Sequence, residues 1–174
     1  MAVEIERKFL VSGEPWRAAA SATRIRQGYL CGGARAVVRV RMAGERAFLT
    51  VKGEQRGVSR AEYEYEIPVG DAEEMLGRLC QPPLIEKTRY CLTHAGVSWV
   101  IDVFEGENAG LVVAEAEFSK EDQSFELPDW AGAEVTDQPR YLNVNLIAHP
   151  YRLWTAAERG ETGGGPPRQR TGRP

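Results

Sequence analysis

The sequence predicts an α+β fold built on an antiparallel sheet of eight strands that closes, or nearly closes, into a barrel. Eight segments alternate polar and apolar residues with the two-residue period of a strand. Most of them are joined by short turns of hairpin length, which is typical of antiparallel sheets. At 174 residues the chain is long enough for one domain with a sizeable core. We expect that domain to span residues 1–155.

The composition excludes several classes of protein. The formal net charge is −3, so the whole-chain charge does not favour nucleic-acid binding. No apolar run approaches the roughly 18 residues of a membrane helix, and the N-terminus enters a charged strand without a signal peptide. Cys31, Cys80 and Cys91 match neither a zinc pattern nor a disulfide framework. We therefore expect a cytoplasmic protein with free thiols, with neither nucleic acid nor membrane as a partner.

The first strand, residues 3–11, has the most informative pattern. Glu4, Glu6 and Lys8 fall on one parity, and apolar residues fall mainly on the other. Alternate side chains of a strand point to opposite faces, so these three charges share a face. A solvated polar face over a buried apolar face explains this pattern, and so does a lined site with carboxylates for a cation and an ammonium for an anion.

The elements that follow are a short helix and three strands. Pro15 suits the first turn of a helix, which we expect from Ser12 to about Ala20. A strand follows over 23–30. Strands over 36–42 and 46–52 are separated by a two-residue turn and predict a hairpin.

The middle of the chain continues the alternation. The segment 59–68 alternates most strictly, with glutamates on one face and tyrosines on the other. Asp71, with a glutamate three residues later, predicts a capped helix that ends near Cys80. Strands over 84–93 and 97–104 form a second hairpin around a glycine turn, and a last strand is expected over 111–118.

The C-terminal region is less regular. Short helices are expected over 120–125 and 138–147, with Trp130 and Trp154 as packing anchors. From residue 156 the chain is rich in glycine, proline and arginine without apolar periodicity. Such a composition does not offset the entropy lost on ordering, so we predict a disordered tail over 156–174.

A closed barrel could place the charged faces of its strands outside or inside. The charges are segregated by sign from strand to strand, whereas a solvated surface would intersperse them because like neighbours repel. The chain also contains amphipathic helices, which need an apolar surface to pack on. Charges that face inward would leave such a surface on the outside of the barrel. The residues of the charged faces are Glu4, Glu6, Lys8, Arg39, Arg41, Lys52, Glu62, Glu64, Glu66, Lys87, Arg89, Asp102, Glu115 and Glu117. From the pattern alone, both arrangements remain open.

A charged lumen would have a specific chemistry. Buried carboxylates repel one another and take up protons unless a cation balances them. Carboxylate oxygens suit Mg²⁺ or Mn²⁺, whereas arginine and lysine suit phosphate oxygens. Acids and bases lining one lumen therefore suit a ligand that carries several phosphates and brings metal, the arrangement used in metal-assisted phosphoryl transfer.

An ordered set of motifs resembles the CYTH family, the triphosphate tunnel metalloenzymes. The E-x-E-x-K pattern near the N-terminus carries the resemblance first, and the later motifs follow in order over roughly residues 1–150. They are Glu4-x-Glu6-x-Lys8, Arg39-x-Arg41, Thr50-x-Lys52, Glu62-x-Glu64, Lys87-x-Arg89, Asp102, Glu115-x-Glu117 and the R-Y-x-N segment from Arg140 to Asn143. The resemblance implies an eight-stranded antiparallel tunnel, with charges inside, that binds triphosphate and divalent metal.

The resemblance also implies roles for individual residues. The acids expected to hold Mg²⁺ or Mn²⁺ are Glu4, Glu6, Glu62, Glu64, Asp102, Glu115 and Glu117. The bases expected to bind phosphate are Lys8, Arg39, Arg41, Lys52, Lys87 and Arg89. We take Glu4, Glu6, Lys8 and Lys52 as candidate catalytic residues. Tyr29 and Tyr141 are further candidates near the site, whereas Glu66 is either a rim charge or a site residue.

The expected activity is metal-dependent hydrolysis of inorganic triphosphate to pyrophosphate and phosphate, because no segment indicates a nucleobase or thiamine pocket. Thiamine triphosphate and nucleoside triphosphates are alternative substrates, and non-catalytic polyphosphate binding is an alternative function. A class IV-like adenylate cyclase is a further alternative, but those enzymes carry a His-Phe pair before the acidic motif, and the three residues before Glu4 do not contain it. The protein is expected to be a monomer or a homodimer.

Overall fold

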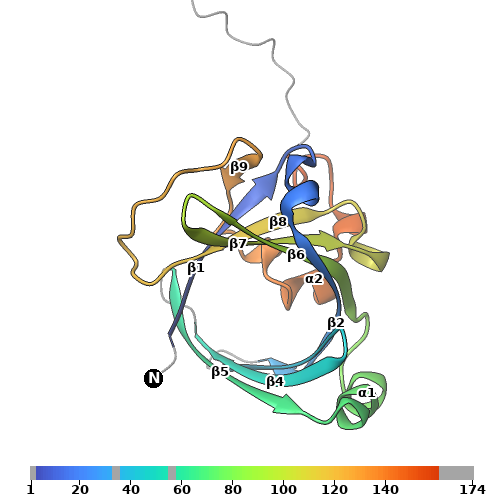
Figure 1. The fold of residues 1–174 in the computed structure, drawn as a ribbon. Helices are drawn as coiled ribbons and strands as arrows, with labels where there is room; N and C mark the ends of the chain where they lie inside the picture. The colour runs from blue at the N-terminus through green and yellow to red at the C-terminus, as the bar shows by residue number, and fades with distance from the viewer. Residues whose placement is uncertain (1–2, 33–35, 55–57, 161–174) are drawn as a thin grey trace, which may run out of the picture.

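The computed structural model describes residues 3–32, 36–54 and 58–160, and over these residues one antiparallel sheet curves into a closed barrel (Figure 1). The strand order is β5-β4-β3-β2-β6-β7-β8-β1, and β1 then pairs with β5 to close the ring. The strands are β1 (Val3–Val11), β2 (Ser21–Gly32), β3 (Ala36–Ala43), β4 (Arg46–Gly53), β5 (Ser59–Ile67), β6 (Ile85–His94), β7 (Val97–Phe104) and β8 (Val112–Glu117). The predicted eight-stranded antiparallel barrel is confirmed.

One edge of β1 has two successive partners. The N-terminal part of β1 pairs with β5, and its C-terminal part pairs with the short strand β9 (Ala131–Glu134). The sequence did not predict β9, because the segment AGAE lacks the alternation and the β-branched residues typical of strands. β9 lies on the edge of β1 beyond the residues that pair with β5.

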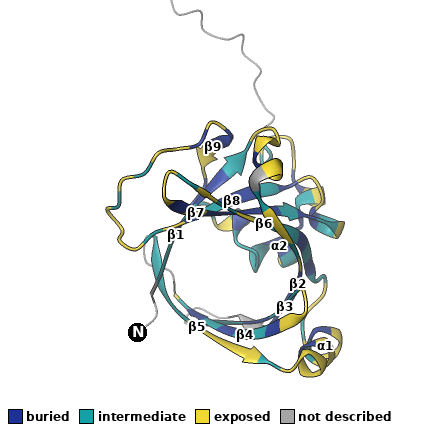
Figure 2. Cartoon of the chain, in the orientation of Figure 1, coloured by how far each residue is buried: buried dark blue, intermediate teal, exposed yellow. Residues whose placement is uncertain are grey.

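The outer face of the barrel over β1, β7 and β8 carries an aromatic cluster. Trp99 is fully buried there, against Phe9, Trp16 and Trp130. The 3-10 helix η1 (Pro15–Ala19) supplies Trp16, so the predicted helix over 12–20 is present but shorter. Trp130 is a packing anchor, as predicted. Figure 2 shows this buried part of the sheet in dark blue.

The helix predicted over 120–125 is wrong. In the described structure this segment is a turn followed by extended chain, in which the Ser119 amide donates to the side chain of Gln123 at 3.1 Å. Phe125 packs against Phe118 and Trp99, with ring centroids 4.9 and 6.2 Å apart. The tertiary contact of this aromatic side chain with the sheet therefore overrides the local preference for a helix.

Helix α1 (Val69–Arg78) covers the outer face of β3 and β4. Its buried residues Ala72 and Leu76 belong to one apolar cluster with Val40 and Ala47. The helix begins before Asp71, and Pro68 at its N-cap makes no side-chain hydrogen bond. The predicted capping box is therefore wrong, because the chain enters the helix directly from β5.

The C-terminal segments fill one end of the barrel, inside the outline of the ring in Figure 1. Leu146 and Trp154 cluster with Phe104 and Val113, which point inward because each lies two residues from an inward-facing charge of its own strand, Asp102 in β7 and Glu115 in β8. The segments are η2 (Gly106–Asn108), η3 (Pro139–Tyr141), α2 (Asn145–Ala148) and η4 (Tyr151–Leu153). The helix expected over 138–147 is thus split into η3 and α2. These two pack on inward-facing residues, whereas α1 and η1 pack outside as predicted.

The predicted tail falls partly within the described residues. Arg159 donates to the carbonyl oxygen of Tyr151 at 3.3 Å, and Glu158 accepts a hydrogen bond from the Thr155 amide at 2.7 Å. Residues 161–174 lie outside the described residues, so the division at residue 156 stays a prediction.

Cys80 and Cys91 are free thiols, whereas the side chain of Cys31 lies outside what is described. Among the described helices, none combines the length and the apolar character needed to cross a membrane.

Candidate functional site

The charged faces of the strands point into the barrel and line a cavity of about 810 Å³. In the β1–β8 register Glu6 is opposite Glu117 and Lys8 is opposite Glu115, so both strands present charges to the same interior. The predicted site residues that line this cavity are Glu4, Glu6, Lys8, Tyr29, Arg39, Arg41, Lys52, Glu62, Glu64, Arg89, Glu115 and Glu117. The lumen arrangement left open by the pattern is therefore the one the structure adopts.

The carboxylates of β1 are held by cations from two other strands and by Lys8 of β1 itself. Glu4 accepts hydrogen bonds from Lys52 Nζ at 3.0 Å and from Arg60 Nε at 2.6 Å. Glu6 accepts from Arg60 at 2.9 Å and from Lys8 Nζ at 2.9 Å. Lys52 comes from β4 and Arg60 from β5, so the closure of the barrel brings these groups together.

Lys8 and Glu115 form a short, largely buried ion pair in the cavity. Their closest nitrogen and oxygen atoms are 2.5 Å apart, and Lys8 is buried. Burial alone would lower the pKa of Lys8, but the carboxylates of Glu115 and Glu6 raise it. Burial alone would raise the pKa of Glu115, but Lys8 and Arg89 hold it well below its ordinary value. Both groups are therefore charged at neutral pH.

The arginines of β3 face the glutamates of β5 across β4. Arg41 donates to both oxygens of Glu64 at 2.8 Å, and Arg39 donates to Thr50 and to Glu64 at 3.1 and 3.3 Å. Burial would raise the pKa of Glu64, but Arg41 and the Thr50 hydroxyl lower it. Glu62 is likewise paired with Lys52 at 2.8 Å. On this wall of the cavity, the arginine side chains are therefore paired with glutamates that also line the cavity.

Lys87 and Asp102 lie behind the cavity wall. Lys87 Nζ is 2.5 Å from Asp102, and Arg89 donates to both Asp102 oxygens at 2.8 Å. Burial lowers the pKa of Lys87 to about 8, whereas Arg89 and Lys87 outweigh burial and lower the pKa of Asp102. We infer that Asp102 stays ionised, with its charge balanced chiefly by the bidentate Arg89. Neither Lys87 nor Asp102 is among the residues that line the cavity.

Glu117 has a different environment from the other acids. It lies at the end of β8, and no basic side chain of the described chain is within ion-pair distance of its carboxylate. Burial and the neighbouring Glu115 raise its pKa, and Glu4 and Glu6 act in the same direction. A carboxylate at this place, among other acids, is the kind of group that a bound cation would stabilise.

Comparison with known proteins agrees with this geometry. The model of the CYTH domain family matches residues 2–151. The chain belongs to the CYTH domain family. The match covers every strand of the barrel and the C-terminal segments as far as the first residue of η4.

Relatives of this CYTH chain include two curated inorganic triphosphatases. The protein from Acetivibrio thermocellus is 51% identical over 152 residues, which is 87% of this chain and 97% of the relative. The protein from Nitrosomonas europaea is 42% identical over 147 residues, 82% of this chain and 95% of the relative. A crystal structure of an inorganic triphosphatase has a TM-score of 0.63 and 38% identity, with 89% of this chain and 97% of that chain covered.

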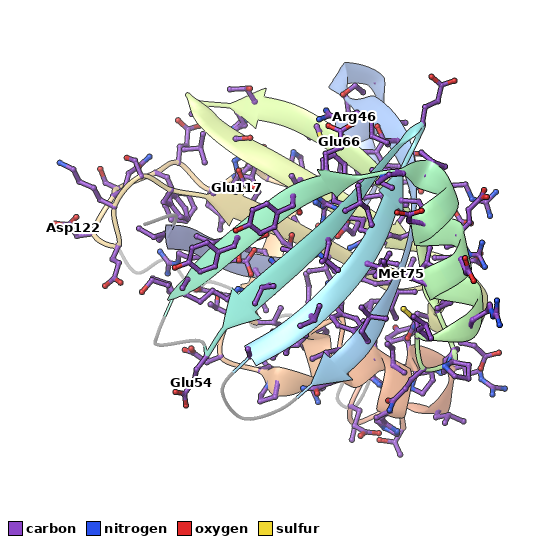
Figure 3. All side chains as sticks on the ribbon, turned by 90° about the horizontal axis from the view of Figure 1, so that it is seen from below. Arg46, Glu54, Glu66, Met75, Glu117 and Asp122 are labelled. Carbon is purple, nitrogen blue, oxygen red and sulfur yellow. The ribbon has the colours of Figure 1, made fainter. Side chains whose placement is uncertain are left out.

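Three predicted candidates of the CYTH site have different surroundings. Tyr29 lines the cavity, and burial raises the pKa of its hydroxyl to about 12. Tyr141 instead packs on Trp154, with ring centroids 5.1 Å apart, and does not line the cavity. Glu66 is exposed and pairs with Arg46 at 2.6 Å, at the far end of the β4–β5 hairpin from Glu54 (Figure 3). Glu66 is thus a rim charge.

The predicted site residues did not include three polar or charged residues that line the CYTH cavity, Glu54, Arg60 and Asn143. Arg60 continues the parity of Glu62 and Glu64, so the alternation of β5 was sufficient to place it inside. Asn143 accepts from Lys87 at 3.3 Å and lines the cavity, and only the R-Y-x-N motif indicated it. The parity signal was available for Arg60, whereas Asn143 lies outside the strands, where alternation does not apply.

The donor set of the cavity fits a divalent cation by its chemistry. Glu4, Glu6 and Glu117 supply carboxylate oxygens, the ligands that Mg²⁺ and Mn²⁺ prefer. Among the described residues, the side chains do not form a preassembled group of three metal ligands. The oxygens of Glu4 and Glu6 are instead turned to Arg60, Lys8 and Lys52.

Proposed function

We propose that this chain hydrolyses inorganic triphosphate to pyrophosphate and phosphate, with Mg²⁺ or Mn²⁺ as the metal. The observation that carries the proposal is the composition of the cavity. Among its described lining residues are seven carboxylates and six cationic side chains, all within one volume of about 810 Å³. The identity with curated inorganic triphosphatases over most of both chains supports the choice of substrate.

The balance of charge favours a polyanion that arrives with metal over a bare polyanion. A bare polyanion entering the cavity would meet slightly more acids than bases, which is unfavourable. A polyanion that arrives with divalent cations would satisfy both sets of side chains, since the carboxylates gain the metal and the bases gain phosphate oxygens. We therefore expect binding to require metal.

The residues would divide the chemistry as follows. Glu4, Glu6 and Glu117 would hold the metal, which supplies a bound water of lowered pKa and neutralises phosphate charge. Arg39, Arg41 and the lysines would hold the phosphate chain and neutralise the charge that develops on the transferred phosphoryl group and on the leaving pyrophosphate. Overall, a water oxygen would bond to the terminal phosphorus as the bond from that phosphorus to the bridging oxygen breaks, and pyrophosphate would leave while the proton of the water passes to the medium.

Asp102 has a positioning role in this proposal. Its two oxygens are occupied by Arg89 and Lys87, so it would orient these bases toward the phosphates. This replaces the metal-ligand role that the family resemblance implied for it. Glu62 and Glu64 would act similarly on Lys52 and Arg41.

A phosphate-release assay tests the proposal. The substrates are inorganic triphosphate, ATP, thiamine triphosphate and pyrophosphate, each with Mg²⁺ or Mn²⁺ and with EDTA. We expect the highest kcat/KM on triphosphate, none with EDTA, and near-complete loss in Glu4→Gln. The Arg46→Gln variant, which alters an exposed pair at the rim, serves as the active control. Equal turnover in wild type and Glu4→Gln, or faster turnover of ATP or thiamine triphosphate, would contradict the proposal.

A further inference from the structure

Arg60 occupies the point where the barrel closes. It lies on β5 opposite Glu4 of β1, in the short stretch where these two strands pair. Its Nε donates to Glu4 at 2.6 Å and its terminal nitrogen donates to Glu6 at 2.9 Å. One guanidinium thus bridges the two acids of β1 that would hold the metal.

The ion pairs of Arg60 differ from those of the neighbouring lysines. Lys8 pairs with Glu115 as well as with Glu6, and Lys52 pairs with Glu62 as well as with Glu4. Within the described residues, the ion pairs of Arg60 are with Glu4 and Glu6. The lysines therefore keep a carboxylate partner if the acids of β1 turn to a metal, whereas Arg60 loses both.

A divalent cation and this guanidinium need the same oxygens. A cation bound to Glu4 and Glu6 would lie within a few ångströms of the positive charge of Arg60, among side chains that are at most 20% exposed, so the two charges would repel. Glu4 and Glu6 therefore cannot bind the metal and Arg60 at the same time without weakening one of the two interactions. The arginine fork also suits a phosphate as well as a carboxylate, so the displaced side chain has an alternative partner once triphosphate enters.

Building on the proposed function, we propose that Arg60 is an internal counter-ion that competes with the divalent cation for Glu4 and Glu6. Metal entry displaces the guanidinium, and a bound triphosphate accepts it. Metal and triphosphate therefore strengthen each other's binding, and this coupling is equal in both directions. Without triphosphate, Arg60 weakens metal binding and links β5 to β1 where the barrel closes.

Direct measurement of Mn²⁺ binding tests this competition without any turnover. The dissociation constant is measured by calorimetry or by the EPR signal of free Mn²⁺, with and without a triphosphate analogue whose bridging oxygens are methylene groups. Without the analogue, Arg60→Gln should bind Mn²⁺ roughly tenfold more tightly than wild type, a size typical of coupling between sites. With saturating analogue this advantage should disappear or reverse.

The control is Arg46→Gln, which removes an arginine that also pairs with a glutamate but lies at the exposed rim. It should bind Mn²⁺ like wild type in both conditions. If Arg60→Gln binds Mn²⁺ no more tightly than wild type in the absence of the analogue, the competition is overturned. An arginine that only bound phosphate, or only supported the fold, would give that result.

Two further measurements cover a variant that does not fold. Arg60→Lys has a single ammonium in place of the bridging fork and should show a smaller gain in Mn²⁺ affinity. In wild-type protein, the Arg60 Nε–H signal in the NMR spectrum should shift on addition of Mg²⁺ alone. An unchanged signal at saturating Mg²⁺ overturns the proposal. The Mn²⁺ measurements do not depend on turnover. If the protein hydrolyses no triphosphate, the proposed function is refuted, and the Mn²⁺ affinities of wild type and Arg60→Gln still test the role of Arg60.

Discussion

Glu115 and Glu117 lie two residues apart on one face of β8, in opposite electrostatic environments. Glu115 is 2.5 Å from Lys8 and 3.4 Å from Arg89, and these cations hold its pKa well below the ordinary value. Burial and the charge of Glu115 instead raise the pKa of Glu117. The metal-free fold is therefore stabilised by one ionised carboxylate and destabilised by the other.

The first prediction is that glutamine has opposite effects at these two positions. Glu115→Gln leaves Lys8 and Arg89 short of a buried partner and should lower the free energy of unfolding by about 3 to 5 kcal/mol at pH 7. Glu117→Gln removes a disfavoured charge and should raise it by about 0.5 kcal/mol, a small gain because solvent screens this partly exposed group. Urea denaturation in EDTA measures both changes.

The pH dependence of these effects follows from the two pKa shifts. The pKa of Glu117 is higher in the folded state, so the gain in Glu117→Gln should be largest at neutral pH and vanish below the ordinary value of 4.5. The pKa of Glu115 is lower in the folded state, so the loss in Glu115→Gln should persist at neutral pH and shrink as the acid protonates. A destabilised Glu117→Gln at pH 7 without metal would contradict this account.

The second prediction concerns Asp102. Asp102→Asn removes the carboxylate that balances Lys87 and Arg89, and it should lower the free energy of unfolding by about 3 to 5 kcal/mol. Urea denaturation measures this loss, and Glu66→Gln at the exposed rim should be nearly silent. A stable Asp102→Asn protein with weakened Mn²⁺ binding would instead restore the metal-ligand role that the family resemblance implied.

The strands were predictable because alternation is a local property of the sequence. In β5, the parity of the glutamates gave the bounds and the inward face, and the same parity places Arg60 inside. β9 has no such pattern, since it pairs only with the end of β1. The segment around Phe125 was predicted as a helix because local propensity does not include its contact with the outer sheet.

The site residues were predictable as a set, but their individual roles were not. The family resemblance implied a metal-ligand role for Asp102. Its partners are Lys87 and Arg89 on the neighbouring strand, and only the β6–β7 register reveals them. Tyr141 belonged to a recognised motif, but its ring packs in the apolar core formed with Trp154.

The third prediction tests the phosphate-binding wall. Arg39 is buried, and its guanidinium reaches Thr50 and Glu64 at the cavity. Arg39→Ala should raise KM for triphosphate roughly 10- to 100-fold, the effect of losing a hydrogen bond to a charged group. Steady-state phosphate release measures KM and kcat, with Arg46→Ala as the control. Unchanged KM in Arg39→Ala would place the substrate away from β3.

The fourth prediction concerns the apolar filling at one end of the barrel. Leu146 of α2 is fully buried against Ile85 and Phe104, which close the lumen from the inside. Leu146→Ala leaves a cavity at this contact and should lower the free energy of unfolding by about 2 to 5 kcal/mol. Leu153→Ala, at a side chain that is 54% exposed, is the matched control and should change stability little. Equal losses in the two variants would mean that α2 does not seal the barrel from within.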